Sequence, residues 1–190
     1  MNHQERFPAT LIGAAGCEAD CDALKRVMRL DYRAHGSFLS TSQISQMLSN
    51  TLYHRRGFPY YAFCVVAGLE GGSGQAYVYD AIGSFEQVPV ATAGTGRELL
   101  QPILDRLFCA SNRRPAENKG AMPKPGVLVA SRRTVVDCTV DEAVSFLQQA
   151  YASVSEREIG VGDSVLICVL QQQPDTSCSF QVLRKPLKED

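Results

Sequence analysis

The sequence lacks the long apolar runs and the charge bias that would place it in several large classes of protein. No apolar run approaches the roughly 20 residues that a membrane-spanning helix needs. Residues 1–8 are polar and carry no apolar segment of the kind found in signal peptides. The 19 Lys and Arg residues nearly balance the 20 Asp and Glu residues, so the formal net charge is -1. We therefore expect no binding to nucleic acid or to a membrane surface.

Cofactor-binding motifs are also lacking. There is no Walker-type loop, and the glycine-rich stretch 71–74 is better explained as a hairpin turn than as a phosphate cradle. The three histidines are scattered singly along the chain. Cys17 and Cys21 lie one helical turn apart, but a metal site would need more ligands at short spacing. We expect no metal ion, nucleotide or organic cofactor.

The seven cysteines are odd in number and irregular in spacing, which argues against a disulfide framework. Most lie within apolar runs, so we expect reduced thiols packed in the core. Cys17, between a predicted strand and a predicted helix, could act as a nucleophile at a helix N-terminus. Such a thiol needs a positioned histidine, and neither His35 nor His54 has a suitable spacing. We interpret Cys17 as a packed thiol.

Hydrophobic periodicity predicts a series of strands and helices within a chain of 190 residues, 45% of them hydrophobic, which suits one domain. Short apolar runs predict strands, and apolar residues three and four positions apart predict amphipathic helices. In chain order we expect a strand at 9–15, helices at about 20–35 and 40–56, strands at 60–69, 75–82 and 85–91, helices at 95–108 and from 139, and strands at 164–170 and 179–183.

Polar residues predict where some elements begin and end. Asp20 or Asp22 is expected to cap the first helix, and Thr139 with Glu142 three residues later forms a capping-box pattern. The stretch EGGSG at 70–74 suits a hairpin turn, and residues 110–133 read as a long surface loop. Helices segregated from antiparallel strands predict an α+β fold in a single domain, 1–190.

Nearly the whole chain resembles the beta subunits of the proteasome core particle. The similar stretches are ATLIGAAGCEADCDALKRVMRLDYRAH (9–35), STSQISQMLSNTLYHRR (40–56), GFPYYAFCVVAGLEGGSGQAYVYDAIGSFEQ (57–87), AGTGRELLQPILDRL (93–107) and SVSEREIGVGDSVLICVL (153–170). Within this family, FPYYAF, AGL and YDAIGS are most similar to the non-catalytic subunit at the beta-6 ring position, also called beta type-1.

The resemblance implies a four-layer αββα sandwich, the architecture of the N-terminal-nucleophile hydrolases. The family's first hairpin carries the threonine nucleophile, an aspartate and a lysine, and it has no counterpart in this sequence. An open sheet edge is an aggregation hazard. Three explanations therefore stay open: other elements cover the edge, the gene model is incomplete, or the chain is processed.

The resemblance also implies that this chain is not itself catalytic. Active members use an N-terminal threonine whose own amine can serve as the base, whereas Thr10 lies inside an apolar strand. Three supporting positions depart from the active pattern: Thr95 stands in place of a serine, Glu158 in place of an aspartate, and Val161 in place of a serine hydroxyl. We expect no catalytic residue. The alternatives are an active threonine-type endopeptidase whose N-terminal segment is missing from the sequence, and a free-standing binding module.

The family's architecture implies partners and one further site. Beta subunits assemble with other alpha and beta subunits in stacked seven-membered rings, in the cytoplasm and nucleus, for ATP- and ubiquitin-dependent protein degradation. The resemblance implies that Asp80, Ala81 and Ser84 form a wall of the neighbouring chymotrypsin-like beta-5 pocket, which receives unfolded polypeptide. A competing interpretation is that Asp80 only hydrogen-bonds its own turn.

Overall fold

The computed structural model describes residues 10–36, 38–109, 138–173 and 178–187, and its elements follow the predicted order. The elements are β1 Thr10–Gly16, α1 Glu18–Ala34, α2 Thr41–His54, β2 Ala62–Glu70, β3 Ser73–Tyr79, β4 Phe85–Val88, α3 Arg97–Phe108, α4 Val140–Ser155, β5 Ser164–Gln172 and β6 Cys178–Pro186. Every predicted strand and helix is confirmed in type. The loop predicted at 110–133 lies outside the described residues.

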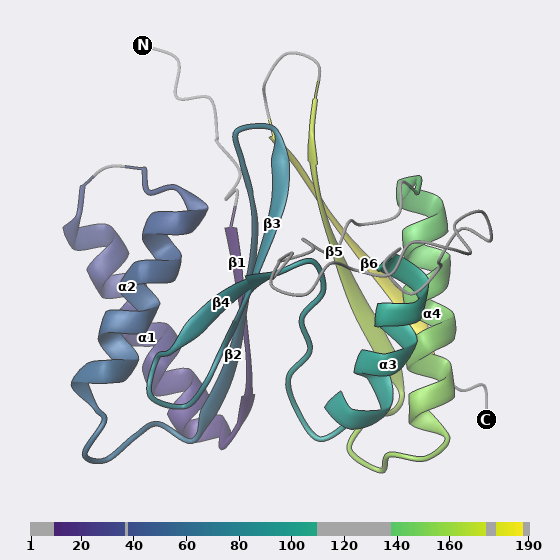
Figure 1. Ribbon diagram of the computed structural model, residues 1–190, viewed down its shortest axis with the longest axis horizontal. Helices are drawn as coiled ribbons and strands as arrows, with labels where there is room; N and C mark the ends of the chain where they lie inside the picture. Colours follow the sequence, from purple (N-terminus) through teal and green to yellow (C-terminus); the bar gives the residue numbers. More distant parts are fainter. Residues whose placement is uncertain (1–9, 37, 110–137, 174–177, 188–190) are drawn as a thin grey trace, which may run out of the picture.

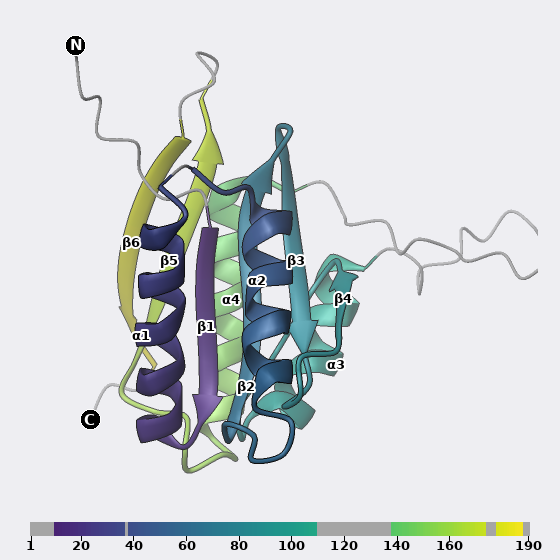
Figure 2. The ribbon, with the colours of Figure 1, turned by 90° about the vertical axis from the view of Figure 1, so that its left-hand side faces the viewer.

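The first half of the chain forms a four-stranded antiparallel sheet in the order β1-β2-β3-β4. Helices α1 and α2 cover one face of this sheet (Figures 1 and 2). Along β2, Ala62, Cys64 and Val66 are fully buried in the core shared with α1 and α2. Phe63 and Ala67 lie on the opposite face, because side chains alternate along a strand, and each of them lines a cavity.

Local turn chemistry explains the β2–β3 hairpin. Glu70 pairs with Ser73, which leaves Gly71 and Gly72 as the two turn residues, with φ of 58° and 82°. Two consecutive positive φ angles favour glycine and match the twist of the flanking strands. The predicted turn is confirmed. β3 ends at Tyr79, three residues earlier than predicted, because residues 80–84 form a turn of their own.

The second half contributes a β5–β6 hairpin and the helices α3 and α4. In Figure 1 the hairpin lies between the four-stranded sheet and the two helices. β5 contacts both β2 and α4, while α3 and α4 pack together around a core of Leu100, Leu104, Phe108, Ala150 and Val154. The described residues thus form two hydrophobic cores, one under each helix pair. α3 continues through Pro102.

Helix capping matches the prediction at α4 but not at α1. Thr139 and Glu142 form both reciprocal hydrogen bonds of a capping box, as predicted. α1 begins at Glu18 with Cys17 as its N-cap and no side-chain cap bond. The expected cap at Asp20 or Asp22 is therefore wrong. The Asp20 carboxylate instead accepts a hydrogen bond of 2.9 Å from the Tyr61 backbone N–H, which joins α1 to the start of β2.

Burial of the cysteines is also more mixed than predicted. Cys21, Cys64 and Cys109 are buried, but Cys17, Cys138 and Cys168 are exposed and Cys178 is half-buried. The interpretation of Cys17 as a packed thiol is wrong, because the residue lies outside the first turn of α1 rather than beneath it. Among the described residues, no helix is long and apolar enough to span a membrane.

Candidate functional site

A cavity of about 610 Å³ opens between the two halves of the molecule. Its wall combines the end of β1, the start of β2, the segment 93–97, the end of α4 and residues 160–161. Gly16, Tyr61 and Phe63 supply one side, and Tyr151 and Val154 supply the other. We call this space the inter-sheet cavity. It is lined mainly by backbone and apolar side chains.

Thr95 and Val161 line the inter-sheet cavity, and Glu158 lies beside them, next to Gly160 and Gly96, although more than 60 positions separate Thr95 from the other two. A Cβ added to Gly160 would lie 2.8 Å from Thr95 Oγ1 and 3.3 Å from Glu158 Oε1. A Cβ added to Gly96 would lie 3.1 Å from a methyl group of Val161. The segments 94–96 and 158–161 therefore pack closely, and at Gly160 an added Cβ would crowd the Thr95 hydroxyl oxygen.

Glu158 and Val161 each make a local contact in this wall. Glu158 Oε1 accepts a 3.2 Å hydrogen bond from the Gly160 backbone N–H, so the carboxylate is used within its own turn. Val161 presents a methyl group toward Gly96. Burial raises the pKa of the Tyr151 phenol above its usual range, because the charged form loses hydration.

Among the described residues, no cluster of three or more His, Cys, Asp and Glu side chains could hold a metal ion. His35 and His54 are exposed and lie outside the cavity wall, and His3 lies outside the described residues.

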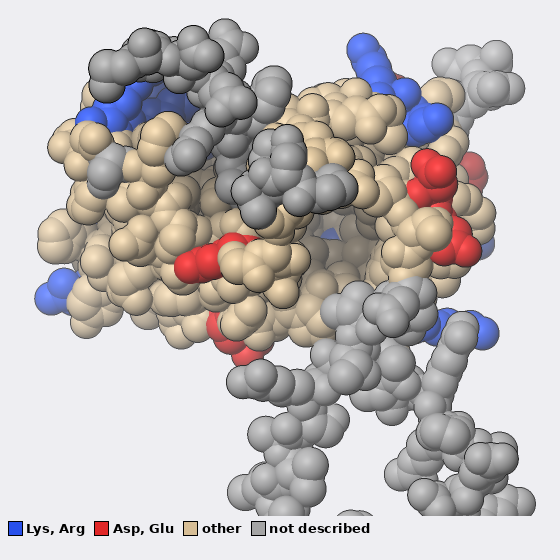
Figure 3. Space-filling model, turned by 90° about the horizontal axis from the view of Figure 1, so that it is seen from above, with Lys and Arg blue, Asp and Glu red and all other residues tan. Residues whose placement is uncertain are grey.

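A second hollow lies at the other end of the inter-sheet space. It has a volume of about 800 Å³ and is lined by all four strands of the first sheet and by β5, with Leu11, Gly68, Cys168 and Leu170 in its wall. Figure 3 looks down on this end and shows the surface hollowed between the left-hand and right-hand parts of the molecule. The sheets therefore touch along only part of their facing surfaces.

Asp80, Ala81 and Ser84 lie together in the turn between β3 and β4, away from the inter-sheet cavity wall. Asp80 Oδ1 accepts hydrogen bonds from the backbone N–H groups of Ile82 (3.0 Å) and Ser84 (2.8 Å). Asp80 and Ser84 are exposed, and Ala81 is half-buried. The Asp80 carboxylate thus stabilises its own turn and is also exposed to solvent. The interpretation that it hydrogen-bonds its own turn is therefore compatible with a contact to a partner subunit.

The turn is fixed against α2. The Ser49 hydroxyl donates a 2.6 Å hydrogen bond to the carbonyl oxygen of Gly83. Gly83 has a φ of 92°, and a Cβ there would overlap the Ser49 carbonyl oxygen. Only glycine fits such a position without strain.

Sequence reasoning missed Gly16, Tyr61, Phe63 and Tyr151 as cavity residues. Gly16 has a φ of 139°, and a Cβ there would overlap the Tyr61 carbonyl oxygen. The close approach of β1 to Tyr61 is stabilised by a 2.8 Å hydrogen bond from the Cys17 N–H to the Tyr61 carbonyl oxygen. A glycine directly after an apolar strand was the available signal, whereas the aromatic residues gave none apart from their hydrophobicity.

The proteasome subunit family model matches residues 8–121, which is more than half of the chain. The chain belongs to the proteasome subunit family. Relatives named proteasome subunit beta type-1 are 36% identical in Arabidopsis thaliana and 34% in Oryza sativa subsp. japonica, each match covering 85% of this chain and 69% of the relative. The relative of that name in Drosophila melanogaster is 33% identical, over 96% of this chain and 72% of its own length.

These matches identify the chain as a beta-type member of the family, as the sequence resemblance indicated. They agree with the α+β arrangement of helices and antiparallel sheets seen here. In this member of the proteasome subunit family, Thr95 and Val161 line the inter-sheet cavity, and Glu158 contacts Gly160 in its wall. The Asp80 turn lies outside the cavity wall.

Proposed function

We propose that this chain is a non-catalytic beta subunit of the proteasome core particle, with residues 1–190 forming one domain of the four-layer αββα type. The order of layers in Figure 1 supports that architecture: α1 and α2, the four-stranded sheet, the β5–β6 hairpin, then α3 and α4. The subunit contributes to ring assembly with alpha and other beta subunits, in the cytoplasm and nucleus, for ATP- and ubiquitin-dependent degradation of unfolded polypeptide.

The observation that carries the non-catalytic assignment is the packing around Gly160. Acyl transfer by a hydroxyl requires a base within hydrogen-bond reach and a third group that orients it. Here the Glu158 carboxylate binds the Gly160 N–H, and Val161 presents a methyl group where the active pattern has a hydroxyl. The Glu158 carboxylate is thus engaged with the Gly160 backbone, and the Val161 side chain offers no hydrogen-bonding group to a nucleophile.

The test is purification of the native assembly through a tag at the C-terminus, followed by treatment with a peptide probe that carries a threonine-directed electrophile. We expect the chain in a large particle with alpha-type and other beta-type subunits, and we expect the probe on other beta subunits only. A covalent adduct on this chain would overturn the non-catalytic assignment. Recovery of the chain only as a monomer would overturn the assignment as a ring subunit.

We further propose that the turn of Asp80, Ala81 and Ser84 forms a wall of the neighbouring chymotrypsin-like pocket. Three features support this: the turn is exposed, Ser49 and Gly83 fix its backbone, and only one carboxylate oxygen of Asp80 is used inside it by the described residues. A fixed carboxylate at a pocket wall favours polar or basic substrate side chains through charge-assisted hydrogen bonds.

A further inference from the structure

The end of α2 and the loop that follows it expose large aromatic side chains. Phe58 is 83% exposed and Tyr53 is 53% exposed, and the neighbouring β3–β4 turn adds Ile82 at 42%. Soluble monomers expose single apolar residues routinely, but several large apolar side chains exposed on neighbouring segments are typical of an interaction site. We call Tyr53, Phe58 and Ile82, with Arg55 and Arg56, the aromatic end.

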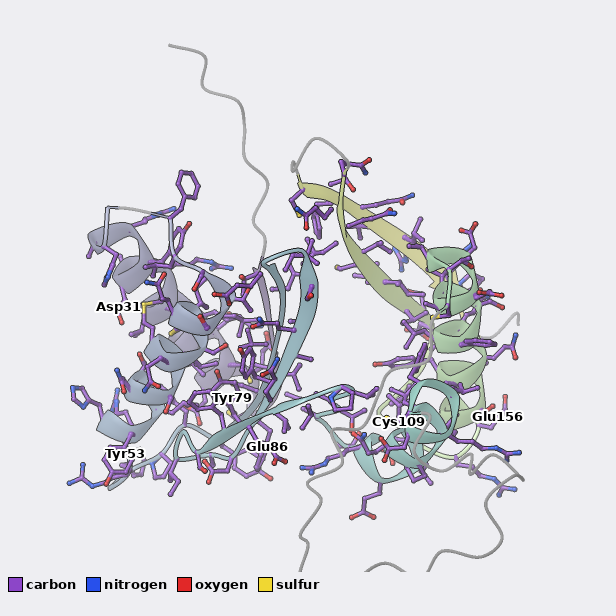
Figure 4. The ribbon with its side chains drawn as sticks, turned by 45° about the horizontal axis from the view of Figure 1, so that its top comes forward. Asp31, Tyr53, Tyr79, Glu86, Cys109 and Glu156 are labelled. Carbon is purple, nitrogen blue, oxygen red and sulfur yellow. The ribbon has the colours of Figure 1, made fainter. Side chains whose placement is uncertain are left out.

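The members of the aromatic end come from two segments that hydrogen bonds hold side by side. Ser49 on α2 binds the Gly83 carbonyl oxygen, and a Cβ at Gly83 would lie 3.1 Å from the Leu52 Cβ, one residue before Tyr53. Ile82 precedes Gly83, and its N–H binds the Asp80 carboxylate. Figure 4 shows Tyr53 at the outer end of α2, on the same edge of the molecule as Glu86. The aromatic end is therefore continuous with the Asp80 turn.

The loop is held in shape by its own contacts. Backbone hydrogen bonds run from the N–H of Arg56 to the carbonyl of Tyr53 (3.1 Å) and from that of Phe58 to the carbonyl of Arg55 (2.8 Å). The guanidinium groups lie over aromatic rings, Arg55 5.0 Å from the Tyr60 ring centre and Arg56 4.8 Å from the Tyr53 ring centre. A loop fixed before association loses less conformational entropy on binding.

Charge is divided across the two flanks of the aromatic end. The guanidinium groups of Arg55 and Arg56 contact aromatic rings, and among the described residues neither group is paired with a carboxylate. Asp80 and Glu86 are exposed on the other flank. Aromatic and arginine side chains that become buried on association are typical of the centre of a protein–protein interface, where charged groups face opposite charges on the partner. The matching partner surface has an apolar socket with acidic groups facing the arginines and a basic or polar group facing Asp80.

We propose that the aromatic end is the contact through which this chain docks against the neighbouring beta subunit, the same one whose pocket the Asp80 turn lines. Phe58 is the anchor in the partner's socket, and the turn is positioned by the contact next to it. This inference rests on the proposed function, because it takes the beta-ring neighbour as the partner.

The experiment places a photoreactive benzoylphenylalanine at position 58 or at position 81, in the full chain, in cells that assemble the particle. After irradiation, mass spectrometry of the purified particle identifies the captured subunit. We expect positions 58 and 81 to capture the same beta subunit. The control is the same probe at position 46, which is exposed on α2 two turns before the aromatic end, and we expect it not to capture that subunit.

Three outcomes would overturn the inference: capture of different subunits from 58 and 81, no capture from 58 in particles that contain the chain, or equal capture of that subunit from 46. Absence of the chain from all particles would instead count against the proposed function. As a second measurement, Phe58→Ser should lower the incorporated fraction about tenfold or more, as loss of an interface anchor does. The melting temperature of the isolated variant should be unchanged, because Phe58 is exposed.

Discussion

Gly160 shows how one missing side-chain carbon shapes the wall of the inter-sheet cavity. A Cβ at this position would lie 2.8 Å from Thr95 Oγ1, closer than van der Waals contact. Gly160→Ala should therefore destabilise the protein by about 1–3 kcal/mol, the usual range for overpacking, as measured by chemical denaturation. Gly162→Ala is the matched control, since nothing lies within 4 Å of its added Cβ. Equal effects of the two changes would show that the packing between residues 95 and 160 is not the cause.

Asp80 carries two separable roles, one in its turn and one proposed at the neighbour's pocket. Asp80→Asn keeps an oxygen that can accept from the N–H groups of Ile82 and Ser84 but removes the charge, whereas Asp80→Ala removes both. We expect Asp80→Ala to lose about 1–2 kcal/mol of stability, and Asp80→Asn to lose less.

Both Asp80 variants should change the peptide preference of the chymotrypsin-like site in assembled particles, with weaker cleavage of peptides that place a basic side chain at this wall. Fluorogenic peptides that differ in one side chain would measure the preference. Unaltered selectivity in both variants, at normal incorporation, would leave Asp80 with the local role alone.

At the scale of the element, α2 is capped from two directions. Ser40 and Gln43 form a capping box at its N-terminus. Glu70, at the end of β2, accepts hydrogen bonds from the Ser42 N–H and from its hydroxyl, both at 2.9 Å. A carboxylate at a helix N-terminus is favourable because it meets free N–H groups and the positive end of the helix dipole. The strand thus stabilises the helix that covers it.

This contact predicts a pH dependence. The hydrogen bond from the Ser42 backbone N–H, more than that from its hydroxyl, lowers the pKa of Glu70 below its usual value of 4.5. The contribution of Glu70 to stability is therefore complete above the unfolded pKa and is lost as the pH falls through the lower folded pKa. Glu70→Gln should be less stable than the unchanged protein at about pH 7, by no more than about 1 kcal/mol because solvent screens the charge.

The difference between Glu70→Gln and the unchanged protein should shrink toward about pH 3, as measured by thermal melting across the pH range. Ser42→Ala is the matched control. It removes the hydroxyl donor but keeps the backbone N–H, so most of the pH dependence should remain. A stability difference that is constant with pH would contradict the assignment of the shift to this contact.

At the scale of the whole molecule, the two hydrophobic cores decide which thiols solvent can reach. Cys21 and Cys64 are fully buried beneath α1 and α2, and burial raises both pKa values, that of Cys64 to about 11. Only the thiolate reacts readily with alkylating agents. In the isolated folded chain we expect iodoacetamide to modify Cys17, Cys138 and Cys168, and to reach Cys21 and Cys64 only after unfolding.

Peptide mapping before and after denaturation would measure this pattern. Rapid modification of Cys64 in the folded chain would show that the core between the helices and the four-stranded sheet opens easily. Modification confined to the exposed thiols would show that this half of the molecule stays closed without ring neighbours.

The sequence by itself determined the order and type of the elements, the β2–β3 turn and the capping box of α4. Each depends on residues within a few positions of one another, as with Gly71 and Gly72 or Thr139 and Glu142, so periodicity and turn chemistry suffice. The resemblance to a family selected Thr95, Glu158, Val161 and the Asp80 turn, but gave no contacts for them.

Only the tertiary structure decided which distant residues meet. Thr95 lies beside Gly160, Glu70 caps α2, and Asp20 binds the Tyr61 N–H instead of capping its own helix. The exposure of Cys17 and of Phe58 was likewise decided by what packs over each position. Such contacts depend on how the sheets and helices pack against one another. That packing is determined jointly by side chains far apart in the sequence, so no local pattern encodes the contacts.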